Sequence, residues 1–269
     1  MDRLRVLYQS FGPAENRDYL DRLGQTLAVC GRLFDVEVDV APLRGTLLTQ
    51  KQHRAFHLAA GAQLLEQLYH AQAKGYAAAV IGNIQDPALY ESRQVLTIPV
   101  LGLLESGLVQ TRTFATSLAL ITTSRLTMPL LRERVRQYGD EARVRAWRTI
   151  EIPLPRLLEA FSDDRRGARI WDDFVATAKL AAADGAELIV PASGMLTSFL
   201  CVRAGDAAGW DVGAGAPVVN PVFTAIAAAA SAARLARAGL PVSRAGTYAS
   251  PDPDVLRQFF RSPATPPER

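Results

Sequence analysis

Cysteine is scarce in this sequence: only Cys30 and Cys201 occur among 269 residues. Two cysteines so far apart form neither a disulfide framework nor the closely spaced ligand pairs of a zinc site. Each lies in an apolar segment that is predicted to be helical. We therefore expect both thiols to be small buried hydrophobic groups.

Long apolar runs are absent as well. The longest apolar segment, 223–240, is broken by Ser231, Arg234 and Arg237, and it falls short of a membrane span. The first residues, MDRLRVLYQSF, contain no apolar stretch long enough for a signal peptide. We expect a cytoplasmic protein with no membrane partner.

Neither sign of charge dominates. The 30 Lys and Arg residues and 27 Asp and Glu residues give a formal charge of +3. The arginines are interleaved with acids, as in RERVRQ and DDRRGAR, and no basic run alternates with aromatic residues. This pattern does not indicate a nucleic-acid partner. The hydrophobic content of 49% and charged content of 21% are ordinary for a soluble, enzyme-like protein.

The sequence also lacks the common cofactor and nucleophile motifs. There is no G-x-G-x-x-G after the first strand, no G-x-x-x-x-G-K-[ST] and no G-x-S-x-G, and Pro217 follows Gly215 too closely for a helix start. His53 and His57 are spaced i, i+4 without the Glu of H-E-x-x-H, so exposed helix histidines are favoured over a metal pair. We expect no cofactor and no metal.

Strand-like and helix-like segments alternate along the chain, which predicts an α/β fold. Short apolar runs bounded by turn residues predict strands that are buried on both faces. The predicted strands are 4–8, 36–40, 78–82, 98–103, 117–122, 144–152, 187–190 and 217–219. The first predicted helix begins at a cap, Asn16 or Asp18, and runs to residue 33. Further helices are predicted over 52–73, 129–138, 153–161, 167–183 and 221–238, and two more are predicted to begin at Asp86-Pro87 and after 105–107. Residues 9–13 are a predicted turn, and residues 44–50 are a predicted loop.

Two stretches, 77–93 and 185–197, share one order: a buried strand, a small polar turn, then a helix. We therefore expect two pseudosymmetric lobes, each with a mostly parallel sheet flanked by helices, and an active-site cleft between them. The first lobe comprises 1–120, with the segment 221–261 packing back on it, and the second comprises 121–220. The tail 262–269 is expected to be disordered. Self-association into a homo-oligomer stays open.

Polar side chains gather where these strands end. In parallel sheets, ligands bind at the carboxyl ends of the strands. Hydroxyls, amides and backbone N–H groups at helix starts suit the oxygen of a small carboxylate or imide. Each residue could equally serve only to cap the helix that follows it. The candidate positions are Gln9, Ser10, Asn83, Thr122, Thr123, Ser124, Ala192, Ser193 and Gly194.

Several of these stretches resemble a known family. The segments VIGNIQDPALYESR, IPVLGLLESG, SLALITTSRLTMPLLRERV, GAELIVPASGM and PVVNPVFTAIAAAASAARLA, followed by GTYASP, occur in an order similar to that of the aspartate/glutamate/hydantoin racemase superfamily, and most closely its hydantoin racemase-like branch. The resemblance covers nearly the whole chain. It implies two pseudosymmetric α/β lobes with one site between them, and a small-molecule substrate.

The resemblance also implies a mechanism that this chain cannot perform. Such enzymes racemise with two cysteines, one per lobe, on opposite sides of the substrate carbon. Here the first position holds Asn83 and the second falls on Ala192 or Ser193. An amide takes no proton at neutral pH, and a serine hydroxyl is a far weaker acid than a thiol. Cys201 lies about two helical turns beyond Ser193, so we expect it to point away from the cleft.

Three functional interpretations remain. The first is an isomerase or lyase that forms an enolate-like intermediate, with Asn83 and Ser193 at the catalytic positions and Thr123 beside them. The second is a binder of a small acid that has no catalytic activity, and the third is another enzyme class on the same fold. In the first case another group, such as Glu105, Tyr90 or His57, would move the proton.

Overall fold

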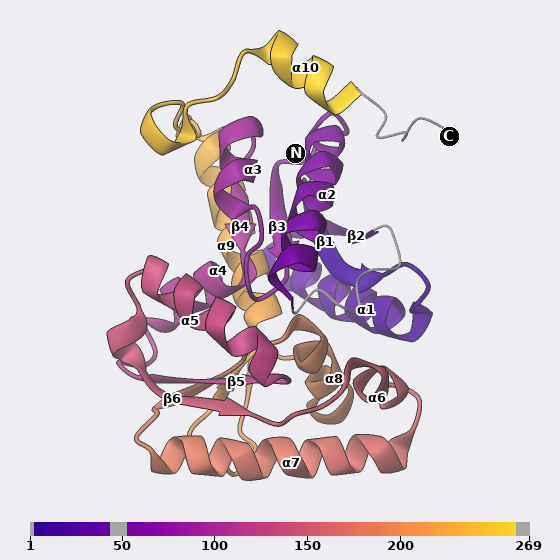
Figure 1. Cartoon of the computed structure of the whole chain (residues 1–269), viewed down its shortest axis with the longest axis vertical. Coiled ribbons are helices and arrows are strands. Elements are labelled where there is room, and N and C mark those ends of the chain that lie inside the picture. Colours follow the sequence, from indigo (N-terminus) through magenta and orange to yellow (C-terminus); the bar gives the residue numbers. More distant parts are fainter. Residues whose placement is uncertain (1–2, 44–52, 262–269) are drawn as a thin grey trace.

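Two β-sheets organise the protein, one above the other (Figure 1). The structure is a computed structural model that describes residues 3–43 and 53–261. The upper sheet is built from the first third of the chain, and the lower sheet from residues 118–219. The predicted α/β fold with two lobes is confirmed.

The first sheet has the order β2-β1-β3-β4, and all its pairs are parallel. Its strands are β1 (Leu4–Pro13), β2 (Val36–Leu43), β3 (Ala78–Gly82) and β4 (Val100–Gly102). Every residue of β3 is buried, as its apolar run predicts. The connecting helices are α1 (Arg17–Phe34), α2 (Arg54–Gln72) and α3 (Leu89–Val95).

The second sheet repeats this order. Its strands run β6-β5-β7-β9-β8, parallel except for the last pair. The bounds are β5 (Leu118–Thr122), β6 (Val144–Thr149), β7 (Leu188–Pro191), β8 (Gly209–Trp210) and β9 (Val218–Val219). Strand β7 therefore occupies the place in this sheet that β3 occupies in the first, and β5 the place of β1. This correspondence is the pseudosymmetry expected from the sequence.

Helices cover both sheets and join the lobes (Figure 1). Helix α9 contacts α4, α1 and β3, so the chain returns to the first sheet after completing the second. Its Pro221 stands at the first helical position, where the missing N–H costs nothing. The remaining helices are α4 (Leu103–Thr111), α5 (Met128–Gln137), α6 (Leu154–Glu159), α7 (Asp164–Ala183), α8 (Gly194–Ala204), α9 (Pro221–Arg237) and α10 (Pro253–Arg261), with short 3-10 turns at Arg125–Thr127, Glu141–Arg143 and Gly246–Tyr248.

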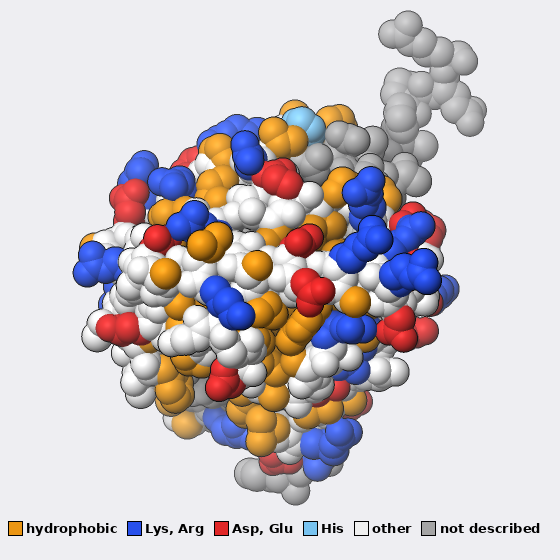
Figure 2. Space-filling view, turned by 90° about the horizontal axis from the view of Figure 1, so that it is seen from below, with side chains coloured by type: hydrophobic (Ala, Val, Ile, Leu, Met, Phe, Trp, Pro, Cys, Tyr) orange, Lys and Arg blue, Asp and Glu red, His pale blue; other side chains and the backbone are white. Residues whose placement is uncertain are grey.

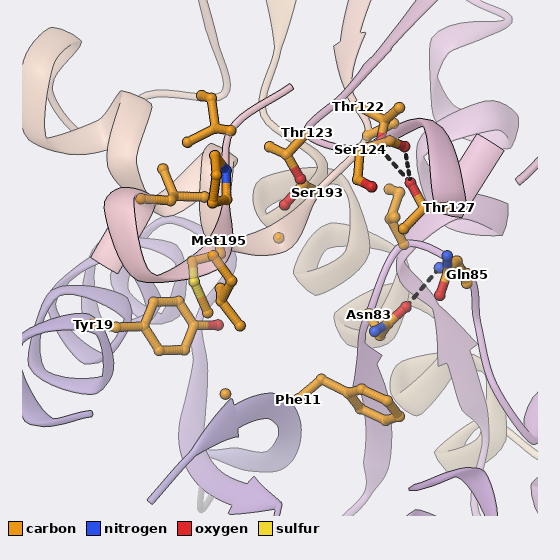
Figure 3. Close-up of a pocket in the computed structure, with 18 of the residues that line it drawn as sticks. Phe11, Tyr19, Asn83, Gln85, Thr122, Thr123, Ser124, Thr127, Ser193 and Met195 are labelled. Atoms are coloured by element: carbon orange, nitrogen blue, oxygen red, sulfur yellow. Dashed lines mark hydrogen bonds between the residues drawn. The ribbon is translucent and has the colours of Figure 1, made fainter. Parts of the chain in front are cut away.

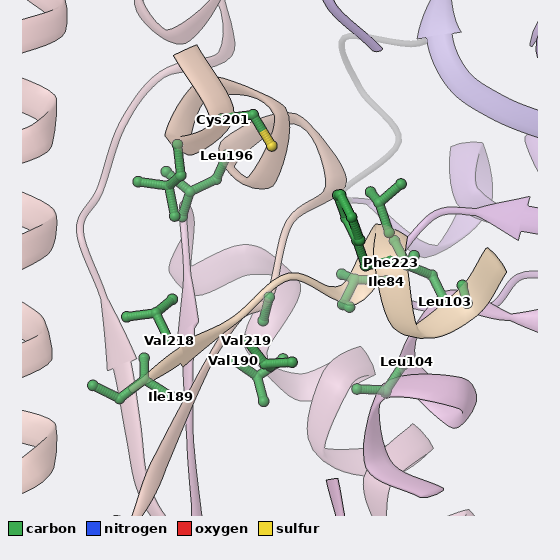
Figure 4. Packing of buried hydrophobic residues seen from close by; sticks show 14 of the residues in the cluster. Ile84, Leu103, Leu104, Ile189, Val190, Leu196, Cys201, Val218, Val219 and Phe223 are labelled. Carbon is green, nitrogen blue, oxygen red and sulfur yellow. The ribbon is translucent and has the colours of Figure 1, made fainter. Parts of the chain in front are cut away.

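One apolar cluster extends through both lobes. It includes Val80 of the first sheet, Ile121 and Val190 of the second, and Phe223 of α9 between them. Figure 4 shows residues of β7, β9, α8 and α9 packed in this cluster. Burial of this continuous apolar surface, at about 25 cal/mol per Å², holds the two sheets in one relative position.

The surface carries mixed charge. Figure 2 shows one face on which Lys and Arg side chains are interspersed with Asp and Glu. Within the described ranges 3–43 and 53–261, no helix is long and apolar enough to cross a membrane.

Three local predictions near the strand ends are wrong. Residues 9–13 form the end of β1 rather than a turn, because Gln9 and Ser10 pair with Ile81 and Gly82 of β3. Asp86-Pro87 does not open a helix: Asp86 has φ 44° and α3 begins only at Leu89. The strand predicted at 98–103 is only three residues long, since the helix after it begins at Leu103 instead of after 105–107.

Other differences are small. Strand β6 ends at Thr149 rather than at 152, and β8 and α10 have no counterpart in the predictions. Asn16 caps α1 as expected, accepting a hydrogen bond from the Tyr19 N–H. The loop predicted at 44–50, the start of the helix predicted at 52 and the tail 262–269 lie outside the described residues. The lobe limits 1–120 with 221–261, and 121–220, stay a prediction.

Candidate functional site

A cavity of about 300 Å³ lies where the strand ends of the two sheets face each other (Figure 3). The two lobes approach closely there: a Cβ placed on Gly194 would lie 3.4 Å from the carbonyl oxygen of Gly82. The cavity is lined by Phe11, Gly12, Tyr19, Gly82, Asn83, Ile84, Gln85, Thr122, Thr123, Ser124, Thr127, Glu151, Ile152, Pro153, Leu154, Leu157, Ala192, Ser193, Gly194 and Met195.

Asn83 follows β3 directly and lines the cavity. Its side-chain oxygen accepts a hydrogen bond from the Gln85 N–H at 2.8 Å, which fixes the orientation of the amide. Because the oxygen is used for this local turn, the amide nitrogen is the group left for a ligand. Asn83 therefore offers a free donor, while its oxygen keeps one further lone pair.

The turn after β5 contributes hydroxyls. Ser124 Oγ accepts from the Leu126 N–H, and Thr122 Oγ1 pairs with Thr127 Oγ1 at 2.8 Å. Thr123 also lines the cavity, and Figure 3 shows its side chain beside that of Ser193. Thr122 and Ser124 thus hold the turn, while Thr123 adds its side chain to the cavity wall.

Ser193 follows β7 and caps α8. Its hydroxyl oxygen accepts from the Leu196 N–H at 3.3 Å, so its own O–H can still donate. Gly194 and Met195 form the start of α8 and line the cavity. The first N–H groups of a helix have no partner within it and carry partial positive charge, which favours an oxygen or anion there.

Gln9 and Ser10 do not line the cavity, although they pair with the last two residues of β3, directly before Asn83. Gln9 donates to the Ala41 carbonyl inside the fold. Ser10 Oγ instead pairs with the hydroxyl of Tyr19 at 3.2 Å, and Tyr19 lines the cavity. Ser10 can therefore act on a ligand only through Tyr19. A side chain at Gly12 would overlap the Tyr19 ring, so glycine is required there.

The three residues considered for proton transfer lie elsewhere. Glu105 is ion-paired with Arg93 and, with Tyr90, lines a separate hollow near α5. His57 lines a second cavity between α2 and α5. None of the three is part of the cavity at the strand ends.

Among the lining residues that sequence reasoning missed, three bear directly on the chemistry of the cavity: Tyr19, Gln85 and Glu151. Tyr19 and Glu151 are the only residues of the cavity wall, as the structure describes it, whose side chains titrate. Burial raises the pKa of the Tyr19 hydroxyl, so it remains a neutral donor. Gln85 is buried, and its amide nitrogen has no partner among the described residues. An unpaired buried donor is costly, and because Gln85 lines both this cavity and the one between α2 and α5, a ligand or a water in either can satisfy it. No local sequence pattern distinguishes these residues.

Asp86 was also missed, and it supports the site from behind. It is fully buried, and its carboxylate accepts hydrogen bonds from the N–H groups of Leu104 and Glu105 and from the Tyr138 hydroxyl. Burial raises its pKa to about 7, while these three donors oppose the rise. Asp86 thereby ties the turn after β3 to the start of α4. Gly102 has no side chain because a Cβ there would overlap this carboxylate.

The described wall of the cavity contains no cysteine and no Lys, Arg or His. Cys30 and Cys201 are both buried in the core, as predicted. Burial raises the pKa of Cys201 to about 11, and Asn220 donates a hydrogen bond to its sulfur. These thiols cannot serve the cavity.

Comparisons with known proteins agree with this architecture. The model of the Asp/Glu/Hydantoin racemase family matches residues 48–233. A hydantoin racemase from Rhizobium meliloti is 32% identical over 188 residues, which is 70% of this chain and 72% of that protein. Allantoin racemase from Klebsiella pneumoniae has a TM-score of 0.70 at 21% identity over 93% of this chain and 94% of its own.

Allantoin racemase from Pseudomonas fluorescens is similar to the same degree, with a TM-score of 0.68 at 20% identity, covering 93% of this chain and 98% of its own. At this identity, the two structures show that the fold is shared. The family model and the sequence similarity go further, because each extends over more than two thirds of the chain. This chain belongs to the Asp/Glu/hydantoin racemase family.

Proposed function

We propose that this protein is a cofactor-independent isomerase or lyase that acts on a small cyclic imide through an enolate-like intermediate, without the two-thiol mechanism. The observation that carries the proposal is the cavity between the strand ends. Its described wall has hydrogen-bond donors from both lobes but no thiol.

The donors suit an oxygen that gains negative charge during reaction. The Asn83 amide nitrogen comes from the first lobe, while the hydroxyls of Thr123 and Ser193 come from the second. Fixed donors of this kind stabilise a developing oxyanion, and removal of one typically costs about 10²–10³ in rate. The local hydrogen bonds of Asn83 and Ser193 orient both groups before a ligand binds.

The charge of the cavity favours an imide over a carboxylate. Glu151 is the only charged side chain of the described wall, and it is negative. A carboxylate ligand would lie near this charge, and although Glu151 itself pairs with Arg125, the described wall offers no cationic side chain to the ligand. A neutral cyclic imide instead presents carbonyl oxygens to the donors and an N–H to an acceptor. The relatives are named as racemases of hydantoin and allantoin, which carry such a ring.

The test combines ligand binding with proton exchange. The protein is titrated with a 5-substituted hydantoin, malonate and maleate in a thermal-shift assay, and deuterium uptake at the hydantoin C5 is followed by NMR against a buffer blank. A hydantoin at about one hundred times its dissociation constant should stabilise the fold by about 2.7 kcal/mol, and malonate much less.

Two other outcomes separate the alternatives. Stabilisation by malonate or hydantoin without any exchange above the blank would identify a binding protein that has no catalytic activity. No stabilisation by any of the three ligands would favour a different enzyme class on this fold, since the cavity would then accept none of the proposed substrates.

A further inference from the structure

The loop that follows β6 contains a strained residue at the cavity. Glu151 has φ 41°, a backbone conformation that side chains other than glycine rarely adopt. Glu151 lines the cavity. A glycine would adopt this φ without strain, yet the chain has a glutamate here. Strained non-glycine residues persist where neighbouring structure over-determines them, and they concentrate at functional sites.

The neighbouring hydrogen bonds explain how the strain is held. The N–H of Ile150 donates to the Thr122 carbonyl at 3.0 Å, and the N–H of Ile152 donates to the Thr123 carbonyl at 2.9 Å. These two hydrogen bonds fix the backbone on either side of Glu151 in the loop that follows the last β5–β6 pair, Thr122 and Thr149. Bonds on both sides of one residue hold its positive φ in place, which is how neighbouring structure over-determines a strained conformation.

The Glu151 carboxylate is oriented as well. Its Oε1 accepts from the Arg125 N–H at 3.0 Å and lies 3.0 Å from the Arg125 Nε. The side chain remains 48% exposed, so solvent can reach it. Arg125 itself does not line the cavity.

We propose that Glu151 is the base that moves the substrate proton in this cavity, in place of the absent thiols; this rests on the proposed function above. In the step, the C–H bond beside the imide carbonyl breaks and its proton forms an O–H bond on Glu151. The electron pair passes to the enolate oxygen, which accepts hydrogen bonds from Asn83 and Ser193. Carboxylates perform such abstraction where an oxyanion site stabilises the product.

This arrangement has a distinctive kinetic consequence. A single carboxylate acts from one face of the substrate carbon, and its solvent access lets it exchange the captured proton with water before return. In heavy water, deuterium should therefore enter C5 of the hydantoin faster than optical activity is lost. A two-residue mechanism with one group on each face would show no such excess of exchange.

The test uses the full-length protein and three substitutions. Glu151→Gln keeps the size of the side chain and its acceptor for the Arg125 N–H but cannot take a proton. Glu141→Gln is the matched control, because Glu141 is also an exposed Glu, 47% accessible, ion-paired with an Arg outside the cavity. Glu151→Gly removes both the carboxylate and the strain.

The expected results differ for each variant. Glu151→Gln lowers the rate of deuterium uptake about 10²–10⁴-fold, with the hydantoin-induced thermal shift retained, and Glu141→Gln leaves the rate unchanged. The Tm of Glu151→Gly exceeds that of Glu151→Gln by about 1–3 °C, because glycine adopts the positive φ without strain.

The failures are distinguishable. Exchange by the wild type that Glu151→Gln leaves within threefold would overturn the role of Glu151 while the proposed function stands. Absence of exchange in the wild type would overturn the proposed function, and the proton-transfer role with it. A Glu151→Gly protein that is less stable than Glu151→Gln would refute the strain argument.

Discussion

Replacement of the buried Asp86 by asparagine should change how stability depends on pH. Asp86 is fully buried, and burial raises its pKa from the ordinary value of 3.8 to about 7. In the unfolded chain the carboxyl loses its proton near 3.8, whereas in the folded protein it keeps the proton until about 7. Its stabilising contribution is thus fully present below 3.8 and is lost as the pH rises towards 7.

The size of the effect follows from the shift. Each pKa unit corresponds to about 1.4 kcal/mol, so between pH 5 and pH 8 the wild type should lose about 3 kcal/mol through this group. Asp86→Asn cannot ionise and loses nothing by this route. The stability of the wild type relative to the variant should therefore fall by about 3 kcal/mol over that range.

The assay is urea unfolding of both proteins at pH 5, 6, 7 and 8. All other groups titrate in both proteins, so the difference isolates Asp86. Asp211→Asn serves as a control because Asp211 is exposed and caps only a surface turn. A difference that instead grows in favour of the wild type as the pH rises would refute the reasoning. It would mean that the N–H groups of Leu104 and Glu105 and the Tyr138 hydroxyl stabilise the charged carboxylate more than burial destabilises it.

Three further predictions concern the cavity and the thiols. Asn83→Ala should lower the exchange rate about 10²–10³-fold and hydantoin affinity much less; equal losses would mark Asn83 as an ordinary ligand contact. Thiols can be restored with Asn83→Cys and either Ala192→Cys or Ser193→Cys, and the double variant should show exchange accompanied by loss of optical activity. Efficient loss of optical activity by the parent protein would show that the catalytic positions are misplaced. Cys201→Ala should cost about 1–2 kcal/mol in urea unfolding and leave exchange unchanged, because the thiol lies in the core; a large loss of exchange would contradict that placement.

Local chemistry explains why much of the fold could be predicted. The apolar runs at β3 and β7 are buried at every position, because a strand covered on both faces needs a continuous apolar sequence. Asn16 and Gly239 mark helix ends through capping and through a backbone conformation that favours glycine. These signals depend only on residues close in sequence.

Where such signals compete, the tertiary structure decided. Gln9 and Ser10 were expected in a turn, yet they extend β1, because Gln9 pairs with both β2 and β3 and Ser10 pairs with Gly82 of β3. Asp86-Pro87 reads as a helix start, yet the Asp86 carboxylate is used by the N–H groups of a different helix, α4. Neither partner is adjacent in sequence, so no local pattern could indicate the outcome.

The residues of the candidate site also fall into two groups, those that local sequence signals predict and those that only the tertiary structure places. Asn83, Thr123 and Ser193 were found from the sequence because each follows a predicted strand, and the carboxyl ends of parallel strands meet at one edge. Tyr19 and Glu151 could not be found from the sequence. Tyr19 projects from a helix through the space left by Gly12, and Glu151 is placed by the hydrogen bonds that its two neighbours make to the turn after β5. By itself, the sequence determined which strands are buried and that no thiol could occupy the two strand-end positions, because both follow from residue identity. Only the tertiary structure decided which titratable groups face the cavity, because that depends on contacts between segments far apart in the chain.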